Sequence, residues 1–294
     1  MNPIGIQYLY WNDIPLEEAL DLTAAAGADV FECGTAVIHA MPPERRREFG
    51  ALVRSRGLTL TLNGGMPGSD LCSPDEELRR RSIQLSQEAI QAAADAGSAV
   101  WGGIIYSKWL AIPSQSLTRQ ARQEMWDRGI ASLRQVLPAA EQYGVDVCFE
   151  IVNRFEAFMI TTVAEGVRFC EEIGSPRARL LLDAFHMNIE EDSTAAAMEL
   201  AMQHGRFGHL HVSESNRGLP GLRKTNTDWR AFFAALSRVG YTGVVTREPM
   251  VLMETPSSAK YRIWRDMVED GTRETLLTSA RKSIAFLREQ MLSH

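Results

Sequence analysis

Four acidic or imidazole side chains follow apolar, strand-like stretches in the second half of the chain. They are Glu150 in Cys-Phe-Glu, Asp183 after Leu-Leu-Leu, His211 in Leu-His and Glu248 in Thr-Arg-Glu. Successive members are 33, 28 and 37 residues apart, which is the length of one strand with one helix. A helix cap would explain any one of them. Four at successive strand ends indicate a common site instead.

The donor types favour a hard divalent cation. Two glutamates, one aspartate and one histidine suit Mn²⁺, Mg²⁺ or Co²⁺ better than a thiolate-seeking metal, and Zn²⁺ stays open. His209 precedes His211 by two residues and shares its strand face, so we expect it to pack or to support the ligands. His39 and His204 lie in helical or loop contexts and His294 ends the chain. We expect none of these three in the site.

Strand and helix patterns alternate along the whole chain and would position these groups. Strands are expected at residues 4–10, 29–33, 58–62, 99–101, 145–150, 178–182, 207–212 and 243–248. Helices are expected near residues 12–26, with Asn12-Asp13 as the start, and near 43–56, 74–96, 117–143, 163–173, 194–204, 228–239 and 274–292, with a polar loop at 255–271. Glu190 and Glu191 are expected to begin the helix near 194, where acidic side chains are favourable.

Eight strand and helix pairs without a linker predict an α/β fold, a (β/α)₈ TIM barrel formed by residues 1–294 as one domain. The last helix would close the outer ring. Barrel closure would bring Glu150, Asp183, His211 and Glu248 to one mouth, because the carboxyl ends of the strands meet there.

Composition and charge limit the classes of partner. With 45% hydrophobic and 23% charged residues, the chain is an ordinary globular protein. The net charge of -6 argues against nucleic acid and favours a neutral small molecule. Cys33, Cys72, Cys148 and Cys170 show no Cys-x-x-Cys spacing and are expected to be reduced. No signal peptide and no long apolar stretch are recognisable, so we expect a cytoplasmic protein without a membrane partner.

Further candidates lie near the same strand ends. Arg217 follows the seventh strand and can direct its fork of donors at ligand oxygens, or it is a surface arginine. Glu156 is placed similarly after the fifth strand. Tyr8 near the end of the first strand and Trp109 after the fourth belong to the core or line a pocket for the apolar face of a sugar.

The motifs around these residues resemble the ketose 3-epimerases, the D-tagatose and D-allulose 3-epimerase family of the xylose isomerase-like barrels. The similarity runs nearly end to end. It is densest at Glu150-Ile-Val-Asn-Arg-Phe-Glu156, Asp183-Ala-Phe-His186-Met-Asn-Ile-Glu-Glu-Asp192, His211-Val-Ser-Glu-Ser-Asn-Arg217 and Glu248-Pro.

The resemblance implies a set of roles. One divalent metal, expected to be Mn²⁺ with Co²⁺ or Mg²⁺ as alternatives, would be held by Glu150, Asp183, His211 and Glu248. Glu150 and Glu248 would also transfer the proton, His186 and Arg217 would hold the carbonyl end of a ketose, and Glu156 would hold a nearby hydroxyl. A homodimer or homotetramer is implied as well.

Inversion at C3 of a 2-ketose explains why such groups are needed. A proton beside a carbonyl is removed and one is returned to the opposite face. A metal chelated by the C2 and C3 oxygens would stabilise the cis-enediolate as a Lewis acid, while two carboxylates on opposite faces would act as base and acid. The expected activity is C3 epimerisation of free ketoses of the D-allulose/D-fructose, D-tagatose/D-sorbose or L-ribulose type.

Three alternatives stay open. An aldose–ketose isomerase or another sugar proton-transfer enzyme would use the same barrel. A phosphodiester hydrolase would need more histidines and a basic groove, and a sugar-binding module would not need two opposed carboxylates. The chain departs from the family at residues 63–68 and 102–109, where Lys108 is unexpected. Both loops would face the far end of the sugar, and we expect the second to tune which sugar is preferred.

Overall fold

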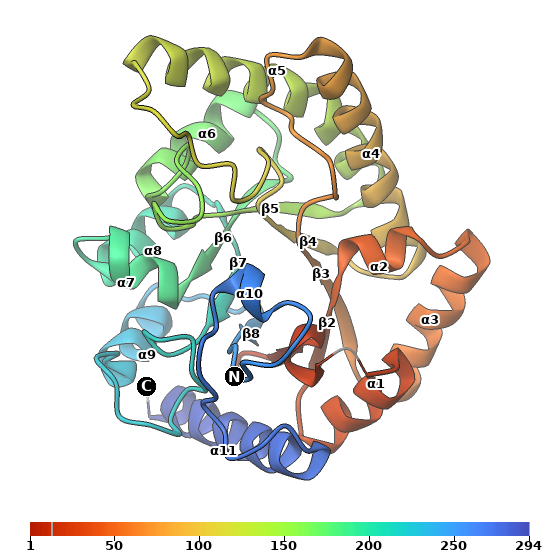
Figure 1. Cartoon of the computed structure of the whole chain (residues 1–294), viewed down its shortest axis with the longest axis vertical. Helices are drawn as coiled ribbons and strands as arrows, with labels where there is room; N and C mark the ends of the chain where they lie inside the picture. The colour runs from red at the N-terminus through yellow and green to blue at the C-terminus, as the bar shows by residue number, and fades with distance from the viewer. Residues whose placement is uncertain (13, 294) are drawn as a thin grey trace.

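The computed structural model describes residues 1–12 and 14–293 and forms a closed barrel of eight parallel strands (Figure 1). The strands follow chain order, and β8 pairs with β1 to close the barrel. They are β1 (Ile4–Gln7), β2 (Val30–Gly34), β3 (Thr59–Asn63), β4 (Val100–Gly103), β5 (Asp146–Glu150), β6 (Ala178–Asp183), β7 (Phe207–Val212) and β8 (Val245–Arg247). The predicted (β/α)₈ barrel is therefore confirmed.

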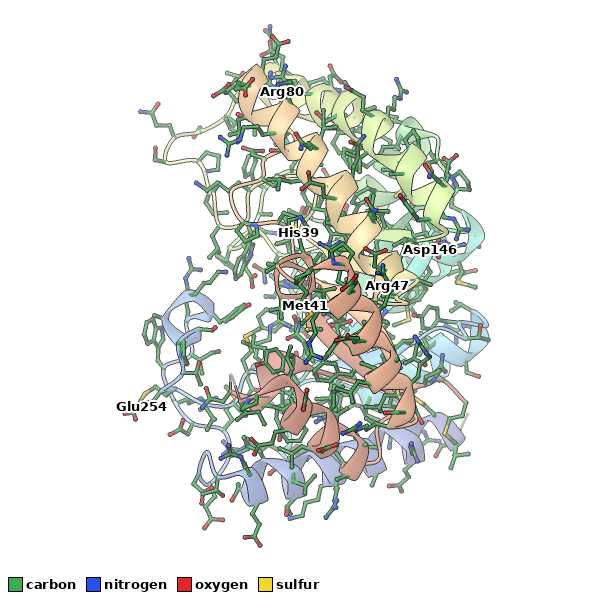
Figure 2. All side chains as sticks on the ribbon, turned by 90° about the vertical axis from the view of Figure 1, so that its right-hand side faces the viewer. His39, Met41, Arg47, Arg80, Asp146 and Glu254 are labelled. Carbon is green, nitrogen blue, oxygen red and sulfur yellow. The ribbon has the colours of Figure 1, made fainter. Side chains whose placement is uncertain are left out.

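Helices surround the barrel. They are α1 (Leu16–Ala25), α2 (Thr35–His39), α3 (Pro43–Ser55), α4 (Glu76–Asp95), α5 (Arg119–Tyr143), α6 (Val163–Ile173), α7 (Ala184–Glu190), α8 (Thr194–Gln203), α9 (Trp229–Arg238), α10 (Ser258–Tyr261) and α11 (Arg273–Leu292), with a 3-10 helix η1 (Tyr8–Trp11). Several begin at a side-chain cap, such as Asp75 before α4 and Ser193 before α8. Figure 2 shows α3 and α4 from outside, with the exposed Arg47 and Arg80 on them.

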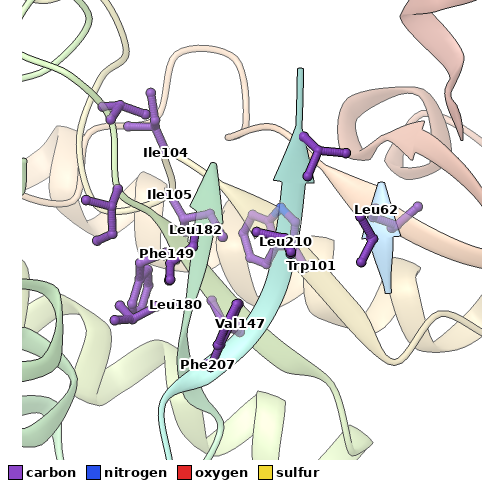
Figure 3. Close-up of a cluster of buried hydrophobic side chains, with 14 of the residues drawn as sticks. Leu62, Trp101, Ile104, Ile105, Val147, Phe149, Leu180, Leu182, Phe207 and Leu210 are labelled. Atoms are coloured by element: carbon purple, nitrogen blue, oxygen red, sulfur yellow. The ribbon is translucent and has the colours of Figure 1, made fainter. Parts of the chain in front are cut away.

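An apolar core fills the space between strands and helices (Figure 3). Val147 and Phe149 of β5 pack there with Leu180 and Leu182 of β6, and all four are completely buried. The residue between each pair faces the barrel interior. The strands are therefore covered on both faces, which explains their apolar runs without alternation. The four cysteines are buried and unpaired, as expected.

A polar layer fills the barrel interior beneath its mouth. Glu32 of β2 accepts a hydrogen bond from Thr61 Oγ1 at 3.0 Å, and its Oε2 lies 2.7 Å from His209 Nε2. Thr246 Oγ1 lies 3.4 Å from the same nitrogen. All four side chains are buried. Their contacts pair Glu32 Oε2 with Thr61 and His209, whereas Glu32 Oε1 and His209 Nδ1 have no hydrogen-bond partner.

The start of the chain differs from the expectation of one strand over residues 4–10. Strand β1 ends at Gln7 and the chain turns into η1. The turn brings Trp11 under α1, where its indole Nε1 donates to Thr23 Oγ1 at 2.8 Å. The expected helix start at Asn12 is also wrong, because α1 begins at Leu16. Asp13 lies outside the described residues.

Three short helices, α2, α7 and α10, were not expected, and α7 changes the position of two acidic residues. Glu190 ends α7 rather than beginning α8, and its carboxylate pairs with Arg154 Nε at 2.8 Å. Glu191 accepts the Val163 N–H at 2.6 Å and so joins the start of α6. Helix α10 lies within the loop expected at residues 255–271.

Helix α11 lies between α9 and α1 in Figure 1. Arg281 Nε donates to Ala25 O at 3.0 Å and Arg288 Nη2 donates to Gly27 O at 2.7 Å, so both ends of the chain are joined through this helix. His294 lies outside the described residues. Among the helices described here, none has the length and apolar character that crossing a bilayer requires.

Two helical glycines give a test of the packing between helices and barrel. A Cβ on Gly50 in α3 would lie 2.1 Å from Ala96 O, whereas a Cβ on Gly129 in α5 would make ordinary contact with Phe169 at 3.5 Å. We expect Gly50→Ala to lower the free energy of unfolding by about 2 kcal/mol through overpacking. Gly129→Ala should raise it by about 0.5 kcal/mol, since it restricts the unfolded chain. Denaturant midpoints measure both, and a stable Gly50→Ala variant would contradict the close approach.

Candidate active site

The carboxyl ends of β5 to β8 bring four buried side chains together at the mouth of the barrel. Glu150, Asp183, His211 and Glu248 each offer one ligand atom, and these atoms all lie within 4.8 Å of one another. Asp183 and His211 are paired in the register of β6 and β7. The barrel thus gathers residues that are far apart in sequence, and the sequence analysis named all four.

Asp183 has two functions at once. Its Oδ1 accepts the Phe185 N–H at 2.8 Å and caps α7, while its Oδ2 faces the site, 2.7 Å from Arg217 Nη1. Both interpretations of the sequence motif, a helix cap and a site residue, therefore apply to this carboxylate. The cap fixes its orientation and leaves one oxygen for a ligand.

His211 is held between two carboxylates. Its Nε2 lies 2.9 Å from Glu32 Oε1 and its Nδ1 lies 3.3 Å from Glu248 Oε2, but neither nitrogen forms a hydrogen bond. A carboxylate behind a histidine is the arrangement that orients metal-binding imidazoles. Glu32 was missed in the sequence analysis, although an acid inside an apolar strand was a visible signal. His209 lies against Glu32 in the deeper layer.

These residues fit a hard divalent cation. Three carboxylates supply oxygen, and the Nδ1 of His211 is a buried nitrogen without a hydrogen-bond partner. An oxygen-rich set with one imidazole matches the preference of Mn²⁺, Mg²⁺ or Co²⁺. Like charges buried this close are stabilised by a compensating cation or by a proton on one of the carboxylates.

Burial and charge shift the pKa values of the two glutamates in opposite directions. Desolvation and then the Glu248 carboxylate hold the pKa of Glu150 well above its usual range. Burial alone would raise the pKa of Glu248, but His211 and Arg217 outweigh it and hold that pKa well below its usual range. Burial raises the pKa of Asp183 to about 6, opposed by Arg217. Two carboxyls with separated pKa values are typical of an acid and base pair.

Arg217 lies at the centre of the charged cluster. Its Nη1 donates to Asp183 Oδ2 at 2.7 Å and to Glu248 Oε2 at 2.8 Å, and its guanidinium stacks on the Phe185 ring at 4.1 Å. The residue is buried and has a left-handed φ of 63°. A left-handed backbone costs conformational energy in a residue other than glycine, and such strain is typical of functional positions.

Both ring nitrogens of His186 face hydrogen-bond donors. The Asn153 N–H points at Nδ1 at 3.1 Å, and a neutral ring can accept at only one of its nitrogens. Burial and then Arg217 lower the pKa of His186, which keeps the ring neutral. Arg217 Nη2 lies 2.9 Å from Nε2. The Arg217 guanidinium and the imidazole are therefore in direct contact beside the cluster of carboxylates.

A cavity of about 490 Å³ opens from this cluster, and three further residues predicted to bind substrate line its wall. Tyr8, Trp109 and Glu156 line it together with Glu150, Arg217 and Glu248. Trp109 Nε1 donates to Glu156 Oε2 at 3.1 Å, and Tyr8 donates its hydroxyl to Ile14 O at 2.6 Å. Desolvation raises the pKa of Glu156. His186 lies next to the cavity through its contact with Arg217.

Several lining residues were missed in the sequence analysis. Gln7 Nε2 donates to Glu248 Oε1 at 2.8 Å, and a glutamine at the end of the apolar strand β1 was the available signal. Lys260 and Tyr261 of α10 also line the cavity. They come from a segment whose polar sequence predicted only a loop, so no local pattern placed them there.

Comparison with known proteins identifies the family. A family model described as xylose isomerase-like TIM barrel matches residues 20–289. The D-psicose 3-epimerase of Ruminiclostridium cellulolyticum is 30% identical over 294 residues, which cover 99% of this chain and 98% of the relative. The chain belongs to the ketose 3-epimerases within the xylose isomerase-like TIM barrel family. The resemblance seen in the motifs is thereby confirmed, and the chain is an enzyme of the isomerase class.

Other ketose 3-epimerases are also similar to this chain over nearly its whole length. The L-ribulose 3-epimerase of Mesorhizobium japonicum is 33% identical over 283 residues, covering 92% of this chain and 90% of that protein. A crystal structure of D-psicose 3-epimerase with D-tagatose from Clostridium cellulolyticum H10 has a TM-score of 0.91 at 30% identity, covering 98% and 99% of the two chains. Members of the family with different named substrates thus share this barrel.

The contact between Glu32 and His211 generates a prediction about the metal. Glu32→Gln should weaken Mn²⁺ affinity about 10-fold to 100-fold, because the amide no longer fixes the imidazole or raises its basicity. Calorimetric titration of the metal-free protein measures this. Glu171→Gln is the matched control, since it changes a carboxylate 2.6 Å from the surface residue His204. Equal affinities in the two variants would remove Glu32 from the support of the site.

Proposed function

We propose that this enzyme inverts C3 of a free ketose in a metal-dependent reaction. The observation that carries the proposal is the pair of buried glutamates at the floor of one cavity, gathered with Asp183 and His211 so that their ligand atoms lie within 4.8 Å of one another. The names of the relatives, D-psicose 3-epimerase and L-ribulose 3-epimerase, support the position of attack and the substrate class. Substrate pairs of the D-allulose/D-fructose, D-tagatose/D-sorbose or L-ribulose type are all consistent with them.

Glu150, Asp183, His211 and Glu248 would hold one divalent ion, and we propose Mn²⁺, with Co²⁺ or Mg²⁺ as alternatives. When bound, it would supply Lewis-acid stabilisation of negative charge on the C2 and C3 oxygens of the ketose. Glu32 would orient His211 for this role, and the capped Asp183 would present one oxygen.

Glu150 and Glu248 would be the proton-transfer pair. They come from β5 and β8, with β6 and β7 between them, so they can reach a ring or chain carbon from two sides. One of them would accept the C3 proton and the other would return a proton to the opposite face, and the epimer that is bound would decide which acts as base. The roles exchange in the reverse reaction.

The remaining side chains would position the sugar. His186 and Arg217 lie in contact, and both would donate to the oxygen on which charge develops as the enediolate forms. Glu156, whose carboxylate accepts the indole N–H of Trp109, would also accept a hydrogen bond from a nearby sugar hydroxyl. The rings of Tyr8 and Trp109 would cover apolar faces of the sugar. These contacts exclude water from the reacting carbon.

An aldose–ketose isomerase would use a similar set of residues, and the two activities differ in which carbon receives the proton. The names of the relatives favour C3. Product analysis separates them, because an isomerase yields an aldose.

A homodimer or homotetramer is also proposed. Phe155, Ile189 and Trp264 are large apolar side chains that are exposed beside the cavity and line a common groove. Exposed apolar groups gathered in this way are typical of an interaction surface. Light scattering coupled to size-exclusion chromatography measures the assembly.

Metal removal tests the proposed function. Dialysis against a chelator should abolish conversion of fructose, allulose, tagatose, sorbose and ribulose, and added Mn²⁺ or Co²⁺ should restore it, because the ketose oxygens need the cation. Chromatography of the products identifies which ketoses interconvert. Full activity of the metal-free enzyme would contradict the metal assignment, and aldose products would favour the isomerase.

Substitution of the two glutamates tests their role in proton transfer. Glu150→Gln and Glu248→Gln should each lower kcat for epimerisation by about 10²-fold to 10⁴-fold, because one of the two faces of C3 then lacks its acid or base. One variant should still exchange the C3 hydrogen of one epimer with solvent, since the surviving carboxylate can remove and return a proton on its own side. Near-normal epimerisation by either variant would exclude that glutamate.

A further inference from the structure

The two carboxylate oxygens of Glu248 face different neighbours. Oε2 lies 3.3 Å from His211 Nδ1 and accepts a hydrogen bond from Arg217 Nη1 at 2.8 Å, on the side of the candidate metal ligands. Oε1 instead accepts the side-chain amide N–H of Gln7 at 2.8 Å, in a contact that is buried. A carboxylate that binds a cation through one oxygen has the other oxygen left to exchange a proton. In Glu248 that second oxygen is the one that Gln7 holds.

Barrel closure places Gln7 beside Glu248. Strand β1 pairs in parallel with β8, and Ile6 lies opposite Arg247 in their register. The next residues along the two strands are Gln7 and Glu248, so their side chains lie on the same face of the sheet. On its other side Gln7 is paired with Glu32 of β2, and its side chain is buried. Neighbouring strands on both sides therefore fix the position of this amide.

Glu150 lacks a comparable support. Within residues 1–12 and 14–293, no side chain donates a hydrogen bond to its carboxylate, and its Oε1 lies 3.7 Å from His186 Nε2. In other respects Glu150 and Glu248 are alike, because both are buried candidate ligands and both line the cavity. A change at Gln7 thus acts on one carboxylate of the pair and leaves the other as an internal reference.

Two roles of Gln7 have different consequences. An amide that only satisfies a buried donor would, when it is removed, weaken the packing of the strand ends and disturb both glutamates alike. An amide that holds Glu248 Oε1 acts instead on the single transition state in which this oxygen takes up or returns the C3 proton. Charge-assisted hydrogen bonds are short and strong, so they fix the rotation of a carboxylate.

We infer that Gln7 is a positioning residue for proton transfer, whose amide fixes Glu248 Oε1 as the oxygen that exchanges the C3 proton. The inference rests on the proposed function, because Glu248 has this role only in that reaction. Where Glu248 is the base, Oε1 takes the C3 proton and the electron pair of the C–H bond stays in the enediolate. Glu150 then supplies a proton to the opposite face. Gln7 acts through the carboxylate that it orients and does not hold the metal.

The partition of the enediolate tests this inference on the Mn²⁺-loaded enzyme. The probes are D-fructose with D-allulose, D-tagatose with D-sorbose, or L-ribulose with L-xylulose, whichever pair the wild type interconverts fastest. Each epimer is incubated separately in D₂O, and NMR compares deuterium at C3 of the recovered starting epimer with conversion to the other epimer. This ratio of exchange to conversion depends on the two proton-transfer transition states and not on how tightly the sugar binds.

Gln7→Met removes the donor and keeps the length of the side chain. The ratio of exchange to conversion should rise about tenfold from the epimer whose C3 hydrogen faces Glu150 and fall about tenfold from the other epimer, since a hydrogen bond to a charged group is lost on one face only. Gln7→Leu should repeat these opposite shifts. Because the ratio is taken within one sample, an incompletely folded variant still gives a result.

Asn63→Leu is the matched control. Asn63 is also an amide at the end of a barrel strand that lines the cavity, and among the residues described in the structure it forms no hydrogen bond with Glu150 or Glu248. Its variant should leave both ratios unchanged, whatever its effect on KM. Equal ratios in Gln7→Met and the wild type, or changes in the same direction from both epimers, would overturn the inference while the epimerase activity stands.

Calorimetric titration with Mn²⁺ adds a readout that does not depend on turnover. Metal-free Gln7→Met should bind Mn²⁺ within about threefold of the wild-type affinity, since Gln7 contacts the oxygen that does not face His211. A loss of about tenfold or more with unshifted ratios would make Gln7 a support of the metal site and overturn the inference. Wild-type enzyme that places no deuterium at C3 of either epimer would contradict the proposed function itself.

Discussion

The chemistry proposed for this site depends on the confinement of like charges at the mouth of the barrel, on the floor of its cavity. Three carboxylates and His211 each place one ligand atom within 4.8 Å of the others, and all four side chains are buried away from water. Such a group of anions is unstable unless cations or protons compensate it. Arg217 and His211 supply part of this compensation, and the separated pKa values of Glu150 and Glu248 are its direct result. A bound divalent ion would supply the rest.

The surrounding fold serves this charge centre. The parallel strands β5 to β8 are neighbours in the barrel, and the end of each contributes one side chain to the cluster. The apolar core behind these strands fixes their positions. Beneath the centre, Glu32 links His209 and His211 and transmits the packing of the barrel interior to a candidate ligand. Loops from β3 and β4 and helix α10 build the cavity above it. The candidate metal ligands thus lie at the strand ends, and the cavity wall above them comes from βα loops, the part of this fold that varies between functions.

The sequence predicted what depends on periodicity and local motifs. The alternation of strands and helices predicted the barrel, and acids at strand ends predicted Glu150, Asp183, His211 and Glu248. It missed features that arise from tertiary packing. Residues 8–11 have an apolar pattern typical of a strand, yet packing of Trp11 under α1 turns them into a helix. An acid within the apolar strand β2 was a signal for Glu32, but only barrel closure brings it to His211 of β7. Lys260 takes its place only when α10 packs over the mouth, and nothing in its own segment indicated that.

The central claim is that two independent carboxylates act on opposite faces of C3. The most direct test is single turnover of a ketose by the Mn²⁺-loaded enzyme in D₂O, with the product examined by NMR. Because the returning proton comes from a second carboxylate that has exchanged with solvent, the account predicts an epimer that carries deuterium at C3. An epimer that retains its original hydrogen at C3, or deuterium located at C1 instead, would contradict it.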